Sequence, residues 1–153
     1  SLLRATLIRS SYDPDPLPEV RDHDIRFAVM PHTQSPSKAE LIRAGAAFNS
    51  PLQIVATDVH PAPTKRKLAP LASCSEPDVI ISSIRKAQDD EGLIITLFET
   101  GGSDRTVALD VAGLGRVASA ETVDMMERRI KSANLKKLAV PANGIVLVKA
   151  LFK

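Results

Sequence analysis

The sequence predicts an all-β protein, mainly a β-sandwich, with one amphipathic helix at about residues 37–49. In the second half of the chain, apolar runs recur roughly every ten residues between clusters of Asp, Glu, Gly and Ser, the rhythm of strands in a sandwich. One stretch alone carries helix start and stop signals together. The hydrophobic content of 44% is high enough for a buried core.

The first sixty residues are predicted to contain three strands. Apolar and polar side chains alternate through "LLRATLIRS" (residues 2–10), as they do in a half-buried strand. The following segment holds prolines at alternate positions and must be an extended loop, because proline fixes φ and donates no backbone hydrogen bond. "DIRFAVMPH" (24–32) and "LQIVATDV" (52–59) are the second and third predicted strands.

The helix is predicted from its ends. Ser35 or Ser37 can act as the N-cap, and Glu40 follows Ser37 at the spacing of a capping box. Asn49 and Pro51 mark the end. With 3.6 residues per turn, one face of this helix is predicted to be apolar and to consist of Leu41, Ala44, Ala47 and Phe48.

The remainder of the chain is predicted to be strand after strand. The predicted strands span residues 78–87, 92–100, 105–111, 116–123 and 144–152. In the third of them, Val107, Leu109 and Val111 share one face, which predicts a half-buried strand. The second and the last are apolar at nearly every position, as a strand covered on both faces would be.

Residues 124–143 are more ambiguous and are interpreted as mostly strand, with the pair Met125 and Met126 in one strand and a turn at 132–134. The predicted organisation is residues 1–60, a connecting loop at 61–69 and a C-terminal sandwich at 70–153, with a single packed unit as the alternative. The loop is rich in proline, which favours a boundary there.

Composition excludes several functions. The net charge of +2 is spread along the chain, so neither nucleic acid nor an anionic membrane is an expected partner. The sequence has no Trp and one Tyr, whereas sugar-binding and base-stacking surfaces need aromatic faces. The single cysteine, Cys74, excludes an internal disulfide and is expected to be a buried structural thiol in a reducing compartment. We expect no signal peptide and a cytoplasmic location, because the first apolar stretch is interrupted by Arg4 and Arg9.

A search for catalytic and metal-binding patterns finds none that is specific. The histidines lack the spacing of a zinc motif, although His23 with Asp22 and Asp24 could be brought together in space. The acidic residues between positions 13 and 24 could hold calcium, but they lack the glycine and distal glutamate of an EF-hand loop. Cys74 has no identifiable base. We therefore expect no catalytic residue, metal or cofactor in this chain.

Six segments, taken in order, resemble the C-terminal β-rich portion of the glycoside hydrolase family 38 α-mannosidases. The segments are "LIRSSYDPDPLPEV", "HDIRFAVMPH", "KAELIRAGAAFNSPL", "VIISSIRKAQDDEGLIITLFETGG", "VASAETVDMMERRI" and "VPANGIVLVKALF". The fourth is similar to a family hairpin that turns at glycine and continues into Leu-Tyr-Glu, with Phe98 here in the place of the tyrosine. The resemblance covers essentially the whole chain.

The resemblance implies the edge of a galactose-mutarotase-like super-sandwich followed by a small C-terminal sandwich. It also implies that the parent enzyme hydrolyses α-mannosidic bonds with retention at a zinc site. The zinc ligands and the aspartate nucleophile of the family belong to its N-terminal part, and their motifs do not occur here. The chain alone is therefore expected to be inactive and to have the remainder of the α-mannosidase polypeptide as its partner, with oligosaccharide substrate bound through the full enzyme.

The loop with Tyr12, Asp13 and Asp15 is the part expected to approach the cleft or a neighbouring subunit, because it is polar and contains the chain's one tyrosine. The alternative is that the loop only caps the sandwich. A free-standing carbohydrate-binding or protein-interaction module is the alternative function. A homodimer is also a possible assembly, since an isolated chain would expose apolar surface that its partner covers.

Overall fold

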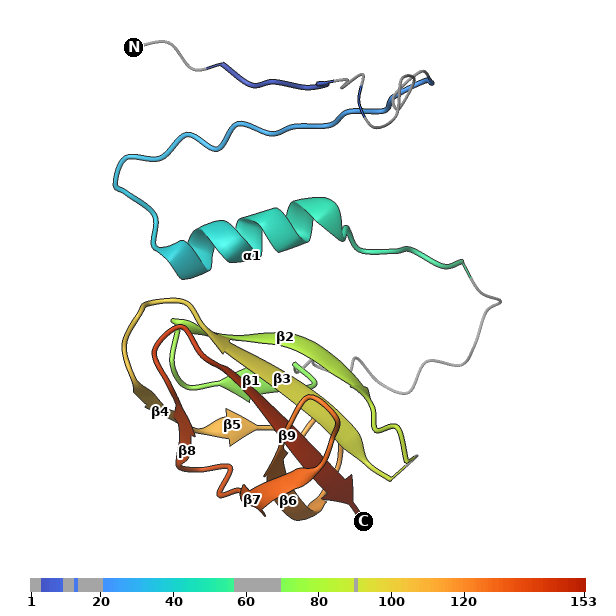
Figure 1. The fold of residues 1–153 in the computed structure, drawn as a ribbon, viewed down its shortest axis with the longest axis vertical. Coiled ribbons are helices and arrows are strands. Elements are labelled where there is room, and N and C mark those ends of the chain that lie inside the picture. The colour runs from blue at the N-terminus through green and yellow to red at the C-terminus, as the bar shows by residue number, and fades with distance from the viewer. Residues whose placement is uncertain (1–3, 10–12, 14–20, 57–69, 90) are drawn as a thin grey trace. The chain divides into compact units, whose positions relative to one another are not determined.

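The computed structural model describes residues 4–9, 13, 21–56, 70–89 and 91–153 (Figure 1). Two compact units are distinguished, Ser1–Gln34 and Ser35–Lys153. The predicted connecting loop at 61–69 lies outside the described residues, so that division of the chain remains a prediction. No helix among the described residues is long and apolar enough to cross a membrane.

The described parts of the first sixty residues contain no strand. Residues 4–9, 21–34 and 51–56 have neither helical nor strand hydrogen bonding, so the strands predicted over 2–10, 24–32 and 52–59 are wrong wherever they can be checked. Apolar side chains on these segments face solvent: Phe27 is 75% exposed and Ile54 is 96% exposed. A strand needs a neighbour to accept and donate its backbone hydrogen bonds, and the described residues supply none.

The helix α1 (Lys38–Asn49) begins as its sequence predicts. The backbone N–H of Glu40 donates to the Ser37 hydroxyl at 3.2 Å, and the Glu40 carboxylate accepts from the Ser37 N–H at 2.7 Å. This reciprocal pair confirms the capping box. The predicted apolar face is wrong, however: Ala39 is the buried residue of α1, while Leu41 and Phe48 are about half exposed.

The rest of the second unit is a β-sandwich, which confirms the all-β class. One layer is a five-stranded antiparallel sheet in the order β2-β3-β9-β6-β7, and two-stranded ladders, β1-β5 and β4-β8, lie against it (Figure 1). The strands are β1 (Ser73–Cys74), β2 (Val79–Lys86), β3 (Leu93–Glu99), β4 (Arg105–Val107), β5 (Leu109–Asp110), β6 (Val117–Val123), β7 (Arg129–Ser132), β8 (Leu138–Val140) and β9 (Ile145–Phe152).

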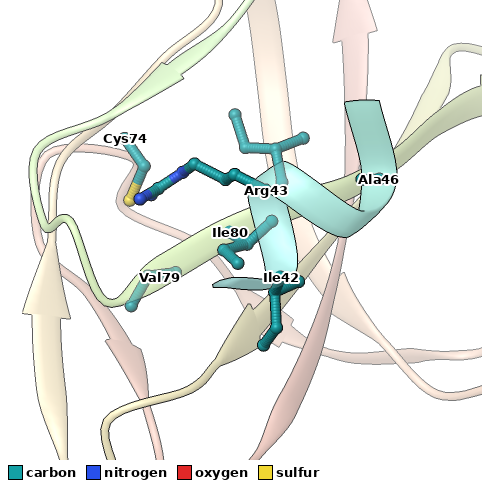
Figure 2. A pocket seen from close by; sticks show the side chains of 7 residues that line it. Ile42, Arg43, Ala46, Cys74, Val79 and Ile80 are labelled. Carbon is teal, nitrogen blue, oxygen red and sulfur yellow. The ribbon is translucent and has the colours of Figure 1, made fainter. Parts of the chain in front are cut away.

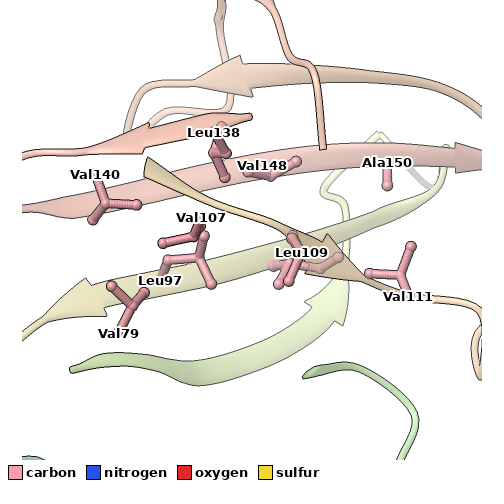
Figure 3. Close-up of a cluster of buried hydrophobic side chains, with 10 residues drawn as sticks. Val79, Leu97, Val107, Leu109, Val111, Leu138, Val140, Val148 and Ala150 are labelled. Carbon is pink, nitrogen blue, oxygen red and sulfur yellow. The ribbon is translucent and has the colours of Figure 1, made fainter. Parts of the chain in front are cut away.

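The main core lies between the sheet and the two ladders (Figure 3). Leu97 of β3 and Val148 of β9 are fully buried in it from the sheet side. Val107, Leu109 and Val111 meet them from the opposite layer, so the predicted apolar face of 105–111 is confirmed, although the run is divided into β4 and β5. Full burial of aliphatic side chains from both layers is the main stabilising term of the sandwich.

A second buried cluster lies on the other face of the sheet and contains Ala87, Ile94, Val123 and Leu147. Since β3 and β9 contribute to both clusters, the prediction that these two strands are covered on both faces is confirmed. Residues 124–128 form a turn after β6, in which the Asp124 carboxylate accepts from the N–H groups of Met126 and Arg128 at 2.9 Å each. Met125 and Met126 are exposed in that turn, so their assignment to a strand is wrong.

Candidate functional site

The residues predicted to approach a cleft are only partly described. Asp13 is exposed at a bend, whereas Tyr12 and Asp15 lie outside the described residues, so the proposed role of this loop stays a prediction. His23 and His32 are exposed. Among the described residues, no three His, Cys, Asp or Glu side chains come together in a way that could hold a metal ion.

The most unusual polar group in the described structure is the carboxylate of Glu99, at the end of β3. Its residue is 0% exposed, which makes it the one acidic residue buried to that extent among the described positions. The backbone around it is held in the sheet, because the Glu99 N–H donates to the Gly144 carbonyl at 3.0 Å. We call Glu99 together with Asp78, Asp104 and Arg105 the Glu99 cluster.

Backbone amides surround the Glu99 carboxylate. Gly101 donates to Oε1, and Gly102 and Asn143 donate to Oε2, each at 2.8 Å. Gly102 (φ +80°) and Asn143 (φ +52°) adopt the left-handed conformation. Successive amides turned inward in this way form a concave anion-binding nest, and here the anion is a side chain of the same protein.

These amides decide the charge of Glu99. Burial opposes ionisation and by itself raises the pKa of Glu99, but hydrogen bonds from the amides of Asn143, Gly102, Gly101 and Ser103 outweigh it and hold the pKa below its ordinary value. The carboxylate is therefore ionised at neutral pH, although it is out of contact with water.

The other members of the Glu99 cluster connect three segments of the chain. Arg105 donates from Nη2 to Asp78 Oδ2 at 2.7 Å, and its Nε, which is buried without a hydrogen-bond partner, lies 3.8 Å from Glu99 Oε1. The carbonyl of Asp78 accepts from both the N–H and the hydroxyl of Thr100. Asp104 accepts from the N–H of Ala142 at 2.9 Å. Residues 76–78, 99–105 and 141–144 are thereby tied together at one end of the sandwich.

Position 101 explains why a glycine follows this strand. A Cβ placed there would come within 2.9 Å of Glu99 Oε1 and 3.0 Å of Asp78 Oδ2, so a side chain would push these carboxylates away from their donors. The sequence carries a signal for the cluster: in "LIITLFETGG" a mostly apolar run ends in one acidic residue, Glu99, and two glycines follow Thr100. Chemically the cluster is a fixed structural element, because its carboxylates are held by donors of the same chain.

A second feature is a hollow of about 340 Å³ between α1 and the sandwich (Figure 2). Ile42, Arg43 and Ala46 line it from α1, and Cys74, Val79, Ile80 and Ile81 line it from the sandwich. Arg43 crosses the gap and donates to the Pro77 carbonyl at 2.6 Å. Cys74 is half-buried against the core and forms one wall of the hollow, so the prediction of a buried thiol is correct only in part.

Ion pairs cover the second apolar cluster. Lys149 of β9 pairs with Asp89, and Arg85 of β2 pairs with Glu127. The hydrogen bond from Lys149 lowers the pKa of Asp89, and the same bond raises the pKa of Lys149 against the opposing effect of burial. These charges neutralise one another and leave no unpaired acid or base at this face among the residues named.

Comparison with known proteins finds relatives of this chain, and the family match lies within the sandwich. Residues 78–148 match the profile of the glycosyl hydrolases family 38 C-terminal beta sandwich domain. "Alpha-mannosidase G" of Dictyostelium discoideum is 26% identical over 101 residues, which cover 66% of this chain and 9% of that protein. "Alpha-mannosidase 2C1" of Homo sapiens is 28% identical over 67% of this chain and 10% of its own length, and the Mus musculus protein of that name is 27% identical over 88% and 13%. The chain thus spans only between 9% and 13% of these relatives.

Proposed function

Because the sandwich at residues 78–148 is a glycosyl hydrolase family 38 C-terminal β-sandwich domain, we propose that the chain is the non-catalytic C-terminal part of an α-mannosidase. In this proposal the complete polypeptide hydrolyses α-mannosidic bonds in oligosaccharides, and the present residues support its catalytic body. The resemblance of the sequence to the family favours a retaining, zinc-dependent reaction and, with the single cysteine, a cytoplasmic location.

The observation that carries the supporting role is the exposed apolar surface of the N-terminal segments. Leu52 is 98% exposed, Ile54 96% and Val29 83%, and all three lie in segments without regular secondary structure. Segments that form no ladder of their own and carry exposed apolar side chains are suited to pair with a sheet of another part of the polypeptide. Their burial there would supply the free energy that holds the two parts together.

The chemistry of the described residues agrees with a supporting role. Catalysis of glycoside hydrolysis needs two carboxyl groups that face the substrate. Here Glu99 is enclosed by backbone amides, Asp124 is held by Arg128, and Glu127 by Arg85. The described residues also do not fit a zinc ion, since they bring no suitable group of ligands together. We propose, as the resemblance to the family implies, that the zinc site and the nucleophile belong to the preceding part of the polypeptide.

An activity assay tests the proposal. The isolated chain, supplied with zinc, should release no p-nitrophenol from p-nitrophenyl α-mannoside, while the longer polypeptide encoded in frame upstream of Ser1 should release it. Turnover by the isolated chain, or an upstream frame that encodes no hydrolase, would overturn the proposal.

Substitution of one exposed residue tests the docking. In the longer polypeptide, Ile54→Asp should lower the thermal midpoint and the activity, because a charge would enter the apolar contact. In the isolated chain the same change should leave the midpoint unaltered, since Ile54 contacts solvent there. Ile54→Val is the matched control and should preserve both properties of the longer polypeptide.

A further inference from the structure

We propose that the Glu99 cluster is an acid-released latch: the Glu99 carboxylate holds the turns at 100–104 and 141–144 together, and its protonation frees both turns while the five-stranded sheet stays folded. The inference concerns the chain by itself and does not depend on the proposed function.

The hydrogen bonds around this carboxylate oppose its protonation. Oε1 accepts from Gly101, and Oε2 accepts from Gly102 and Asn143. Protonation turns one carboxylate oxygen into a hydroxyl, which is a donor and a weaker acceptor: on Oε2 it would displace one of the two N–H donors, and on Oε1 it would weaken the bond from Gly101. It also removes the negative charge that strengthens all three bonds. The carboxylate itself is fully buried, whereas Gly101, Gly102 and Asn143 are exposed residues, so N–H groups that lose this acceptor can turn outward and bond to water.

The charges that face Glu99 come from each neighbouring segment. From β4, Arg105 favours the ionised form through its Nε. The segment before β2 contributes two carboxylates that oppose it: Asp78 Oδ2 lies 2.7 Å from Arg105 Nη2, and Glu76 Oε2 lies 4.0 Å from Arg105 Nη1. Asp104 of the first turn is a further carboxylate and is bound to Ala142. Arg105 is thus shared among several acids, which leaves the backbone amides as the dominant stabilising contacts of Glu99.

The direction of the pH dependence follows from the lowered pKa of Glu99. A carboxyl group with a folded-state pKa below its unfolded-state value stabilises the fold at all pH values above the unfolded pKa. That stabilisation is lost as the pH falls through the folded pKa. The latch is therefore closed at neutral pH and opens only in acid, below the ordinary range for glutamate.

The sheet has contacts that do not depend on this charge. The Glu99 N–H bonds the Gly144 carbonyl, and β3 pairs with β9 from Leu93 to Phe98. The core between the layers consists of aliphatic side chains, which do not titrate. Release of the turns can therefore precede unfolding of the sandwich.

An NMR titration of the full 153-residue chain tests the latch. On acidification, the amide signals of Gly101, Gly102 and Asn143 should shift together with one midpoint, and their hydrogen-exchange protection should fall by about tenfold or more. Protection of Ile95 and Val148 should persist at that pH. Independent midpoints for the three amides, or loss of core protection at the same midpoint, would overturn the proposal.

Two variants separate the charge from the shape of the side chain. Glu99→Gln keeps the size but removes the charge, so the three amides should be poorly protected already at neutral pH and should not titrate. Glu127→Gln is the matched control, because Glu127 also accepts from a backbone N–H, that of Gln88, and should leave the three amides titrating as before. Persistence of their titration in Glu99→Gln would contradict the latch. Should that variant fail to fold, the titration of the unaltered chain still decides.

Discussion

The N-terminal segments and the sandwich have similar strand-forming sequences, yet among the residues that the structure describes only the sandwich forms strands. "DIRFAVMPH" alternates as convincingly as "RTVALDV", but Phe27 in the first is 75% exposed and Val107 in the second is 1% exposed. The second run pairs with β8 and β1, whereas the first has no ladder among the described residues. Alternation shows that a segment can be a strand, but a neighbouring strand decides whether it is one.

The largest expected effect comes from matched isoleucine truncations in the two regions. Ile95→Ala should lower the free energy of unfolding by about 2–5 kcal/mol, because Ile95 is fully buried in the main core. Ile54→Ala should change it by no more than about 0.5 kcal/mol, as expected for an exposed side chain. Urea denaturation of both variants measures the contrast. A comparable loss at Ile54 would show that the N-terminal segments are packed in the isolated chain.

A smaller and pH-dependent effect is expected at Lys149. Asp89→Asn should lower the unfolding midpoint, because the mostly buried ammonium of Lys149 would lose its partner. Because the pKa of Asp89 is lowered in the folded chain, its ionised form stabilises the fold, and this stabilisation is lost as the pH falls through the pKa of Asp89. Because the pKa of Lys149 is raised, its charged form also stabilises the fold, and this stabilisation is lost as the pH rises through the pKa of Lys149. The thermal midpoint of the unaltered chain should therefore fall at both acid and alkaline pH. In Asp89→Asn these two contributions to the pH dependence should be missing, which a series of thermal midpoints from acid to alkaline pH measures.

Lys149→Met is the companion variant and should be close to the original protein at neutral pH, since an apolar side chain of similar length fits beside Ile94 and Leu147. A midpoint as low as that of Asp89→Asn would show that the ion pair itself stabilises the sheet.

The smallest effect is expected at the helix cap. Ser37→Ala should destabilise α1 by about 1 kcal/mol through loss of the capping box. Because Ala39 is the one buried residue of α1, amide exchange in residues 41–44 should accelerate while the urea midpoint of the sandwich stays the same. An equal drop in that midpoint would instead place α1 in the cooperative unit of the sandwich.

Sequence patterns predict an element correctly where the local pattern and the tertiary environment agree. The capping box at Ser37, the apolar face of 105–111 and the doubly covered strands β3 and β9 were predicted from periodicity and side-chain chemistry alone. The face of α1 was mispredicted because helical periodicity cannot say which neighbour the helix meets, and here the small side chain of Ala39 makes the close contact.

Two further features depend on backbone geometry that residue types do not reveal. Glu127 has φ +60°, a conformation that is rare for glutamate and common for glycine and asparagine. The turn that contains Met125 and Met126 therefore lacks the residue types by which such a turn is predicted from sequence. The nest around Glu99 takes donors from residues 101–103 and 143, which are about forty positions apart in sequence. The antiparallel pairings of β3 with β9 and of β4 with β8 bring them together.

The position of β9 has a consequence for the order of events during synthesis. This strand follows the other strands of the sheet in sequence, but it lies between β3 and β6 in the middle of the sheet (Figure 1). Until residues 145–152 have left the ribosome, β2-β3 and β6-β7 can exist only as separate hairpins with open inner edges. Until β9 is available, each hairpin therefore exposes an inner edge that is competent to pair with another strand.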